Sequence, residues 1–181
     1  MKKFLKELLP YLIIIIVVVF IRTFIVTPVR VQGSSMFPTL HDGEILILKK
    51  YDQSYSRFDI VVLKHNKDKL IKRIIGLPGE HVAYKNNTLY INGEKIEEEF
   101  LPEDLEFDDF DTILLGNKIV PENTYLVLGD NRNNSTDSRV IGFIEKDVIL
   151  GTTNFRIFPF TKFGGISWFY YGIQNVLLVE E

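Results

Sequence analysis

One serine and one lysine have the sequence surroundings that catalysis would need. Gly33 precedes Ser35 by two residues and Pro38 follows Ser35 by three, so the chain can approach closely and turn tightly there. Such a turn can aim the Ser35 hydroxyl and the Ser35 N–H at one point, as a nucleophile with a backbone oxyanion donor requires. An ordinary turn rich in Gly, Ser and Pro has the same composition, so spacing alone leaves both interpretations open.

A serine nucleophile needs a base, which could be a histidine or a lysine. The histidines lie beside polar residues next to predicted strands, as solvated side chains do; they are His41, His65 and His81. Lys72 instead lies in the apolar run 70–75. Burial in such a run could lower a lysine pKa from about 10.4 to about 8, at a cost of roughly 3 kcal/mol.

Two interpretations of Lys72 stay open. Alternation along the predicted strand does not decide whether Lys72 or its neighbour Arg73 points inward. Arginine stays protonated, so only Lys72 of the two could act as a base. The structural alternative is a lysine whose side chain extends from a sheet edge into solvent.

A third polar segment covers residues 129–139, where every residue is polar or glycine. It could be a surface loop. It also contains two acid–arginine pairs, Asp130 with Arg132 and Asp137 with Arg139. These pairs would suit a rigid, hydrogen-bonded wall beside the other two segments.

Composition excludes several classes of protein. The sequence has no cysteine, which excludes disulfide scaffolds, zinc fingers and thiol catalysis. Its 3 histidines lie far apart, so we expect no metal and no cofactor. The net charge of −3 argues against a general nucleic-acid binder. With 181 residues, 46% of them hydrophobic, the chain has room for one ordinary domain with a real core.

The N-terminus predicts a membrane anchor. Residues 1–7 carry three lysines, and the mostly apolar segment 8–26 follows; about 20 such residues cross a bilayer. The lysines place the N-terminus in the cytoplasm and residues 27–181 outside. A cleaved secretory signal is one alternative, but the small residues it needs are missing, since Ala83 is the one alanine in the sequence. A buried core helix is the other, but the run 12–21 has no polar face.

Past the anchor, the pattern predicts a mostly β fold of antiparallel sheets. Two short runs are joined by Asn86-Asn87, which is typical of a hairpin turn, and Asn92-Gly93 follows as a second hairpin signal. No segment outside the anchor has a long helical period. The predicted strands are short β-branched runs bounded by Gly, Asp, Asn or Pro; they cover residues 44–48, 59–63, 70–75, 82–85, 88–91, 125–128 and 148–150.

Two further segments need an interpretation. Residues 94–111 hold ten acids and one lysine. They lack the spacing of a calcium-binding loop, so we interpret them as a solvated loop insertion pinned by its aromatic residues, with a metal site as the less favoured alternative. The tail 161–181 is rich in aromatic residues, which suits a membrane interface or a cap on the core.

Taken together, the three polar segments resemble the motifs of the bacterial type I signal peptidases (leader peptidases). The resemblance runs from about residue 8 to about residue 160, in the family's order. The short distance between the second and third motifs is similar to the small, single-anchor, Gram-positive-like members. The matching segments are Gly33-x-Ser35-Met36-x-Pro38-Thr39-Leu40, residues 72–80 (KRIIGLPGE), Gly129-Asp130-Asn131-Arg132-x-x-Ser135-x-Asp137-Ser138-Arg139, and residues 57–62 (RFDIVV).

This resemblance implies a membrane-anchored serine endopeptidase that cleaves N-terminal signal peptides from exported preproteins. Ser35 would be the nucleophile, Lys72 the general base, and Ser135 would hydrogen-bond and position the lysine amine. The supporting wall would comprise Asp137, Arg139, Asp130, Arg132 and Arg73. The oxyanion and substrate-binding region would comprise Gly33, Ser35, Met36 and Pro38, with Gly33 standing where some members carry a second oxyanion donor.

The implied organisation is a cytoplasmic N-terminus (1–7), a plasma-membrane anchor (8–26), an extracytoplasmic peptidase domain (27–160) and the aromatic tail (161–181). The partners would be signal peptides and the lipid bilayer. An inactive, anchored relative that only binds is one alternative, against which the intact Ser35 and Lys72 argue. A self-cleaving repressor-type peptidase with a DNA-binding module is another, and the anchor argues against it.

Overall fold

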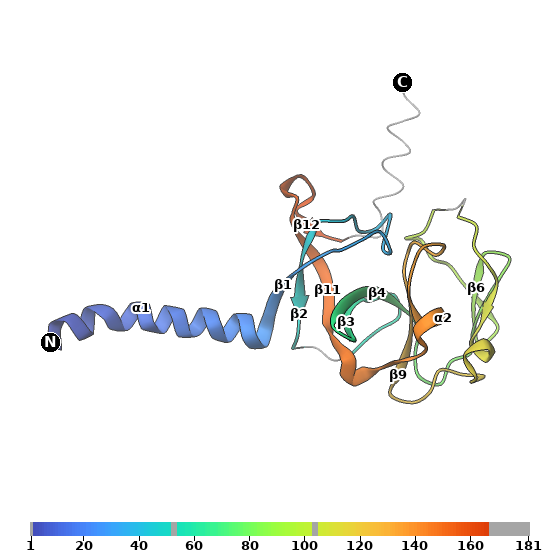
Figure 1. Cartoon of the computed structure of the whole chain (residues 1–181), viewed down its shortest axis with the longest axis horizontal. Helices are drawn as coiled ribbons and strands as arrows, with labels where there is room; N and C mark the ends of the chain where they lie inside the picture. The colour runs from blue at the N-terminus through green and yellow to red at the C-terminus, as the bar shows by residue number, and fades with distance from the viewer. Residues whose placement is uncertain (1, 52–53, 103–104, 167–181) are drawn as a thin grey trace, which may run out of the picture.

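The chain forms a long N-terminal helix and a β-rich body. The structure, a computed structural model, describes residues 2–51, 54–102 and 105–166. The helix projects from one end of the body (Figure 1). The aromatic tail falls largely on residues 167–181, which lie outside the described residues.

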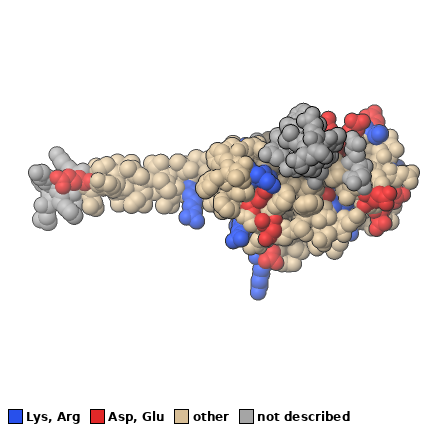
Figure 2. All heavy atoms as spheres, turned by 90° about the horizontal axis from the view of Figure 1, so that it is seen from above, with Lys and Arg blue, Asp and Glu red and all other residues tan. Residues whose placement is uncertain are grey.

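The N-terminal helix α1 covers Lys2–Phe20, and a π-helical turn, Ile21–Ile25, follows. The stretch Glu7–Ile25 is long and apolar enough to cross a membrane, and none of it is buried within the protein. Figure 2 shows that the surface of this helix between its first turns and the body is almost free of charge. The structured body begins at Val26, one residue inside the predicted anchor, because Val26 already pairs with Lys49 in the sheet.

The main sheet has eight strands in the order β1-β2-β11-β3-β4-β9-β10, with β12 paired to β11, and every pairing is antiparallel. All the strands predicted for this sheet are confirmed. Strand β1 was missed, and β11 is much longer than its predicted core. The strands are β1 (Val26–Arg30), β2 (Ile45–Lys49), β3 (Ile60–His65), β4 (Asp68–Gly76), β9 (Thr124–Leu128), β10 (Ile144–Glu145), β11 (Ile149–Phe158) and β12 (Gly164–Gly165).

A second sheet has the order β7-β6-β5-β8. Its two predicted hairpin turns are confirmed, because Asn86, Asn87, Asn92 and Gly93 all have the positive φ that such turns require. The strands are β5 (Val82–Lys85), β6 (Thr88–Ile91), β7 (Glu94–Ile96) and β8 (Phe110–Asp111). Short helices η2 (Thr112–Leu115), α2 (Ser138–Ile141), η3 (Lys146–Val148) and η4 (Phe160–Lys162) occupy connections.

Strand β4 is buried on both of its faces. Ile75 packs into a cluster shared with the second sheet, whereas Ile74 packs into a different cluster within the main sheet. The last five residues of β4 are all buried. Alternation along β4 therefore sends neighbouring side chains into two interior spaces, and neither Lys72 nor Arg73 has to face solvent.

The interpretation of residues 94–111 as a solvated loop is wrong at its two ends, which form strands, whereas its pinning by aromatic residues is confirmed. The segment begins with β7 and ends with β8, because its ends pair with β6 and β5. The side chains of Phe100 and Phe110 are buried in the cluster between the sheets. The segment is thus packed against the body over much of its length.

Candidate active site

Ser35 lies in a turn between β1 and β2. The chain closes into a loop there, since Val31 N–H donates to Glu44 O and Gly43 N–H donates to Val31 O. Inside the loop, Gly33 has a φ of +79° and its N–H donates to Asp42 Oδ1 over 2.8 Å. Glycine adopts this left-handed conformation without strain. The turn therefore leaves Ser35 half-buried at the surface.

The apolar residues of this turn fix it to the core. The Met36 side chain is 1% exposed and packs with Leu40 in the core cluster beside β2. The Met36 side chain is therefore held by packing, and the assignment of Met36 to the oxyanion and substrate-binding region stays a prediction. Pro38 is partly buried and Phe37 is exposed.

Lys72 and Ser35 are in direct contact. The Lys72 amine donates to Ser35 Oγ over 2.6 Å, and the Lys72 side chain is buried in β4. Burial lowers the pKa of Lys72 to about 8, although Asp137 and Asp130 oppose this change. At that pKa, roughly a tenth of the lysines would be neutral near pH 7. A neutral amine at this distance can accept the hydroxyl proton.

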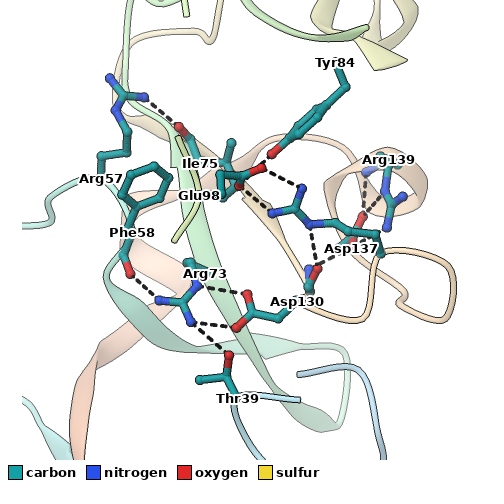
Figure 3. A network of polar contacts seen from close by, with 12 residues as sticks. Thr39, Arg57, Phe58, Arg73, Ile75, Tyr84, Glu98, Asp130, Asp137 and Arg139 are labelled. Carbon is teal, nitrogen blue, oxygen red and sulfur yellow. Dashed lines mark hydrogen bonds and ion pairs between the residues drawn. The ribbon is translucent and has the colours of Figure 1, made fainter. Parts of the chain in front are cut away.

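Arg73 points to the opposite side of β4 and pairs with Asp130. Its guanidinium donates to both carboxylate oxygens of Asp130, over 2.9 and 2.6 Å, and to Phe58 O over 2.9 Å (Figure 3). The two residues meet because β4 and β9 are neighbours, with Arg73 opposite Leu128. The predicted pairing of Asp130 with Arg132 is therefore wrong.

Arg132 pairs instead with Glu98, a residue that sequence analysis did not single out. The guanidinium donates to the two Glu98 carboxylate oxygens over 2.6 and 3.2 Å, and its Nε donates to Gly129 O over 3.1 Å. Tyr84 also donates its hydroxyl to Glu98, over 2.9 Å (Figure 3). No sequence signal distinguishes Glu98 from the other acids of residues 94–111.

The predicted pairing of Asp137 with Arg139 is confirmed. Arg139 donates to the two carboxylate oxygens over 2.9 and 2.8 Å, and Gly129 N–H donates to one of them over 3.0 Å. Burial alone would raise the pKa of Asp137, but the hydrogen bonds from Arg139 and Gly129 outweigh it and the pKa is lowered. Asp137 is therefore a buried carboxylate that stays ionised.

Gly129 lies at the closest approach of three chain segments. A Cβ at this position would lie 2.2 Å from Ser135 Oγ and 2.4 Å from Ser35 O. Among the described residues, Ser135 Oγ is buried without a well-formed hydrogen bond, although it helps to lower the pKa of Asp137. The expected hydrogen bond between Ser135 and the Lys72 amine is therefore not formed in this structure.

Asn131 holds the nucleophile turn from the side of the polar segment 129–139. Its N–H donates to Ser35 O over 3.0 Å and its side-chain amide donates to Ser34 O over 3.1 Å. Within the described part of the chain, nothing accepts the Ser35 N–H. This N–H is therefore free to donate to an oxyanion. Asn131 stands in the motif quoted above, but its chemistry alone did not indicate this role.

Two of the three histidines lie beside acids, and His65 is 3.2 Å from the Asn66 side-chain amide. His41 is 3.6 Å from Glu44, and His81 is 2.9 Å from Asp111. Burial lowers the pKa of His41. In residues 2–51, 54–102 and 105–166, no three acids, histidines or cysteines gather where they could hold a metal ion.

Comparison with known proteins gives matches over most of the chain. A family model described as "Signal peptidase, peptidase S26" matches residues 4–158. Signal peptidase IB of Staphylococcus aureus is 41% identical over 178 residues, which cover 87% of this chain and 93% of the relative. Signal peptidase I S of Bacillus subtilis is 43% identical over 159 residues, which cover 83% and 86%. A crystal structure of a signal peptidase I from Enterococcus faecalis aligns with a TM-score of 0.51 at 37% identity, covering 55% of this chain and 96% of that one.

The Arg73–Asp130 pair predicts a large loss of stability when one partner is neutralised. Asp130→Asn leaves the buried Arg73 guanidinium without its counter-charge, so we expect the free energy of unfolding to fall by about 3–5 kcal/mol. Thermal and denaturant unfolding of the detergent-solubilised chain measure this. The control is Asp147→Asn, because Asp147 is exposed. Equal stability of the two variants would contradict the assignment.

Proposed function

The chain belongs to the signal peptidases of peptidase family S26, which are serine endopeptidases, and on this premise we propose that it removes signal peptides from preproteins with Ser35 as nucleophile and Lys72 as general base. The 2.6 Å contact between the buried Lys72 amine and Ser35 Oγ carries the proposal. A Ser–Lys pair needs no imidazole, which agrees with the histidines lying in other pairs.

The chemistry divides into two steps. Neutral Lys72 takes the proton of Ser35 as Oγ attacks the carbonyl carbon at the cleavage site, and the resulting ammonium returns a proton to the leaving amine. The Ser35 N–H donates to the oxyanion that forms in this step. Lys72, neutral again, then deprotonates a water that hydrolyses the acyl-enzyme. Ser35 regains its proton and the signal peptide is released with a free carboxyl group, the mature protein having left as the amine of the first step.

The supporting residues keep the lysine pKa low enough for this role. A carboxylate near an ammonium group favours the charged form, and both Asp137 and Asp130 act on Lys72 in that direction. Each of these carboxylates is paired with an arginine, Arg139 and Arg73 respectively. The arginines offset the carboxylate charges, and burial then dominates the pKa of Lys72.

Ser135 is the proposed positioning residue for the lysine amine. Its hydroxyl lies beside Gly129, next to the Ser35 carbonyl, with no well-formed hydrogen bond in the described residues. The Ser135 hydroxyl can therefore form a hydrogen bond with the Lys72 amine once that amine no longer contacts Ser35 Oγ. Gly33 and Pro38 shape the turn that carries Ser35, and Arg132 braces Gly129 from behind.

The N-terminal segment is the proposed anchor. The apolar stretch Glu7–Ile25 would span the bilayer, the lysine-rich residues 1–7 would stay in the cytoplasm, and the peptidase domain 27–160 would lie outside. Attachment to the membrane would hold the site where signal peptides leave the bilayer, which raises their effective concentration.

Substitution of either reacting residue tests the proposed pair. Ser35→Ala and Lys72→Met should each lower kcat on a purified preprotein by about 10⁴-fold or more, because the members of such a unit fail together, while the chain stays folded. Cleavage is followed by electrophoresis and the new N-terminus by mass spectrometry. Lys69→Met, at an exposed position of the same strand, is the matched control. Wild-type rates in either reacting-residue variant would contradict the proposal.

The pH dependence of cleavage gives a second test. Lys72 acts only when neutral and its pKa is lowered to about 8, so log kcat/KM should rise with slope one below about pH 8 and level off above it. The acidic limb is measured at constant ionic strength on the wild-type chain. A flat profile between about pH 6 and 9 would exclude Lys72 as the base.

Membrane orientation is testable because the sequence has no cysteine. Lys67→Cys places a single thiol in the exposed turn between β3 and β4, and Lys3→Cys places one before the apolar stretch. A membrane-impermeant maleimide should label Cys at position 67 in intact cells, and Cys at position 3 only after permeabilisation. The reverse pattern would contradict the proposed orientation.

A further inference from the structure

The acidic segment 94–111 contributes one buried carboxylate to the back of the site. The Glu98 side chain is 7% exposed, whereas its neighbours Glu97 and Glu99 are exposed. Glu98 lies two residues after the end of β7, which pairs with β6, and its side chain reaches Arg132 in the polar segment 129–139. One glutamate of a very acidic segment is thus built into the interior.

Glu98 meets a guanidinium that has no access to water. The Arg132 side chain is 1% exposed and makes two hydrogen bonds with Glu98. The Tyr84 hydroxyl donates to the same carboxylate, and the Arg132 guanidinium lies 4.9 Å from the Tyr84 ring. A buried arginine needs such a counter-charge, so the position of Arg132 depends on Glu98.

Arg132 in turn fixes the backbone against which the nucleophile rests. Its Nε donates to Gly129 O, and the space a Gly129 Cβ would need is filled by Ser35 O and Ser135 Oγ. A shift of Gly129 must therefore displace the Ser35 turn or the Ser135 side chain. A chain of direct contacts leads from Glu98 through Arg132 and Gly129 to Ser35.

Two other contacts tie the acidic segment to the same wall. The Phe100 ring centroid lies 3.8 Å from the Arg73 guanidinium carbon, and the same guanidinium binds Asp130. Asn133 donates its side-chain amide to Glu106 O over 2.7 Å. The segment therefore supports both buried arginines of the site, and Glu98 is its one charged contact to them.

We propose that Glu98 is a positioning residue of the Ser35–Lys72 site, acting through Arg132 and Gly129 on the placement of Ser35. This inference rests on the function proposed above. Removal of the Glu98 charge would leave Arg132 without its partner and let Gly129 relax. The Ser35 turn would then drift from Lys72, and solvent would reach the amine.

The test compares three single substitutions that remove the same charge: Glu98→Gln, Glu97→Gln and Glu99→Gln. Cleavage of a purified preprotein is measured as kcat, KM and pH profile, well below the thermal midpoint of each variant. For Glu98→Gln we expect kcat to fall by about 10- to 100-fold, as for a misplaced reacting group, with KM nearly unchanged. Its acidic limb should move to higher pH by about half a unit or more, because a better solvated lysine has a higher pKa.

The two controls should match the wild type. A merely structural role would lower the thermal midpoint of Glu98→Gln and leave its kcat and acidic limb in place, and this result would overturn the inference. If Glu98→Gln does not fold, the same measurements are made on Tyr84→Phe. This substitution removes one hydrogen bond to Glu98 and keeps the ring packed. We then expect a smaller loss of kcat with the same direction of pH shift, and a wild-type profile would overturn the inference.

Failure of this inference is distinguishable from failure of the proposed function. If the wild type cleaves the preprotein and Ser35→Ala does not, the function stands whatever Glu98→Gln does. If Ser35→Ala keeps wild-type activity, the proposed function is wrong, and the inference about Glu98, which rests on it, is wrong as well. The inference concerns only the difference between Glu98→Gln and its two neighbours.

Discussion

The buried contact between Lys72 and Ser35 sets the demands that the surrounding side chains must meet. The pKa of Lys72 is about 8 in the folded protein, whereas its usual value is 10.5. At pH values below both of these pKa values, the difference costs about 3 kcal/mol of folding stability. The cost arises because Lys72 lies in a strand that is buried on both faces. Alternation puts Lys72 on the face of β4 that carries Ile74, which packs within the main sheet, and the second sheet covers the opposite face.

A second constraint is that buried charges must be paired without restoring the charge on the lysine. Around the site, the described residues meet it with the pairs Arg73–Asp130, Arg139–Asp137 and Arg132–Glu98. Two of these carboxylates, Asp137 and Asp130, raise the pKa of Lys72, and Arg139 opposes them. Arg73–Asp130 joins the polar segment 129–139 to β4, Arg132–Glu98 joins it to the acidic segment, and Arg139–Asp137 lies within it (Figure 3).

The nucleophile turn is held from two directions. Met36 and Leu40 pack into the core below it, while Asn131 binds the carbonyl groups of Ser34 and Ser35 from the side. These bonds engage carbonyl groups and leave the Ser35 N–H free for an oxyanion. The packing of Met36 and Leu40 and the hydrogen bonds from Asn131 together fix the position of the Ser35 hydroxyl in this short turn.

The sequence by itself determined the features whose cause is local. Apolar length predicted the anchor, β-branched runs and Asn-rich turns predicted the strands and hairpins, and motif resemblance singled out Ser35 and Lys72. The Asp137–Arg139 pair was also predictable, because its members lie two residues apart. Only the tertiary structure decided that Asp130 binds Arg73, 57 residues away, and that Arg132 binds Glu98, 34 residues away. Every acid of residues 94–111 has the same local chemistry, so the partner of a buried arginine is set by which strands become neighbours.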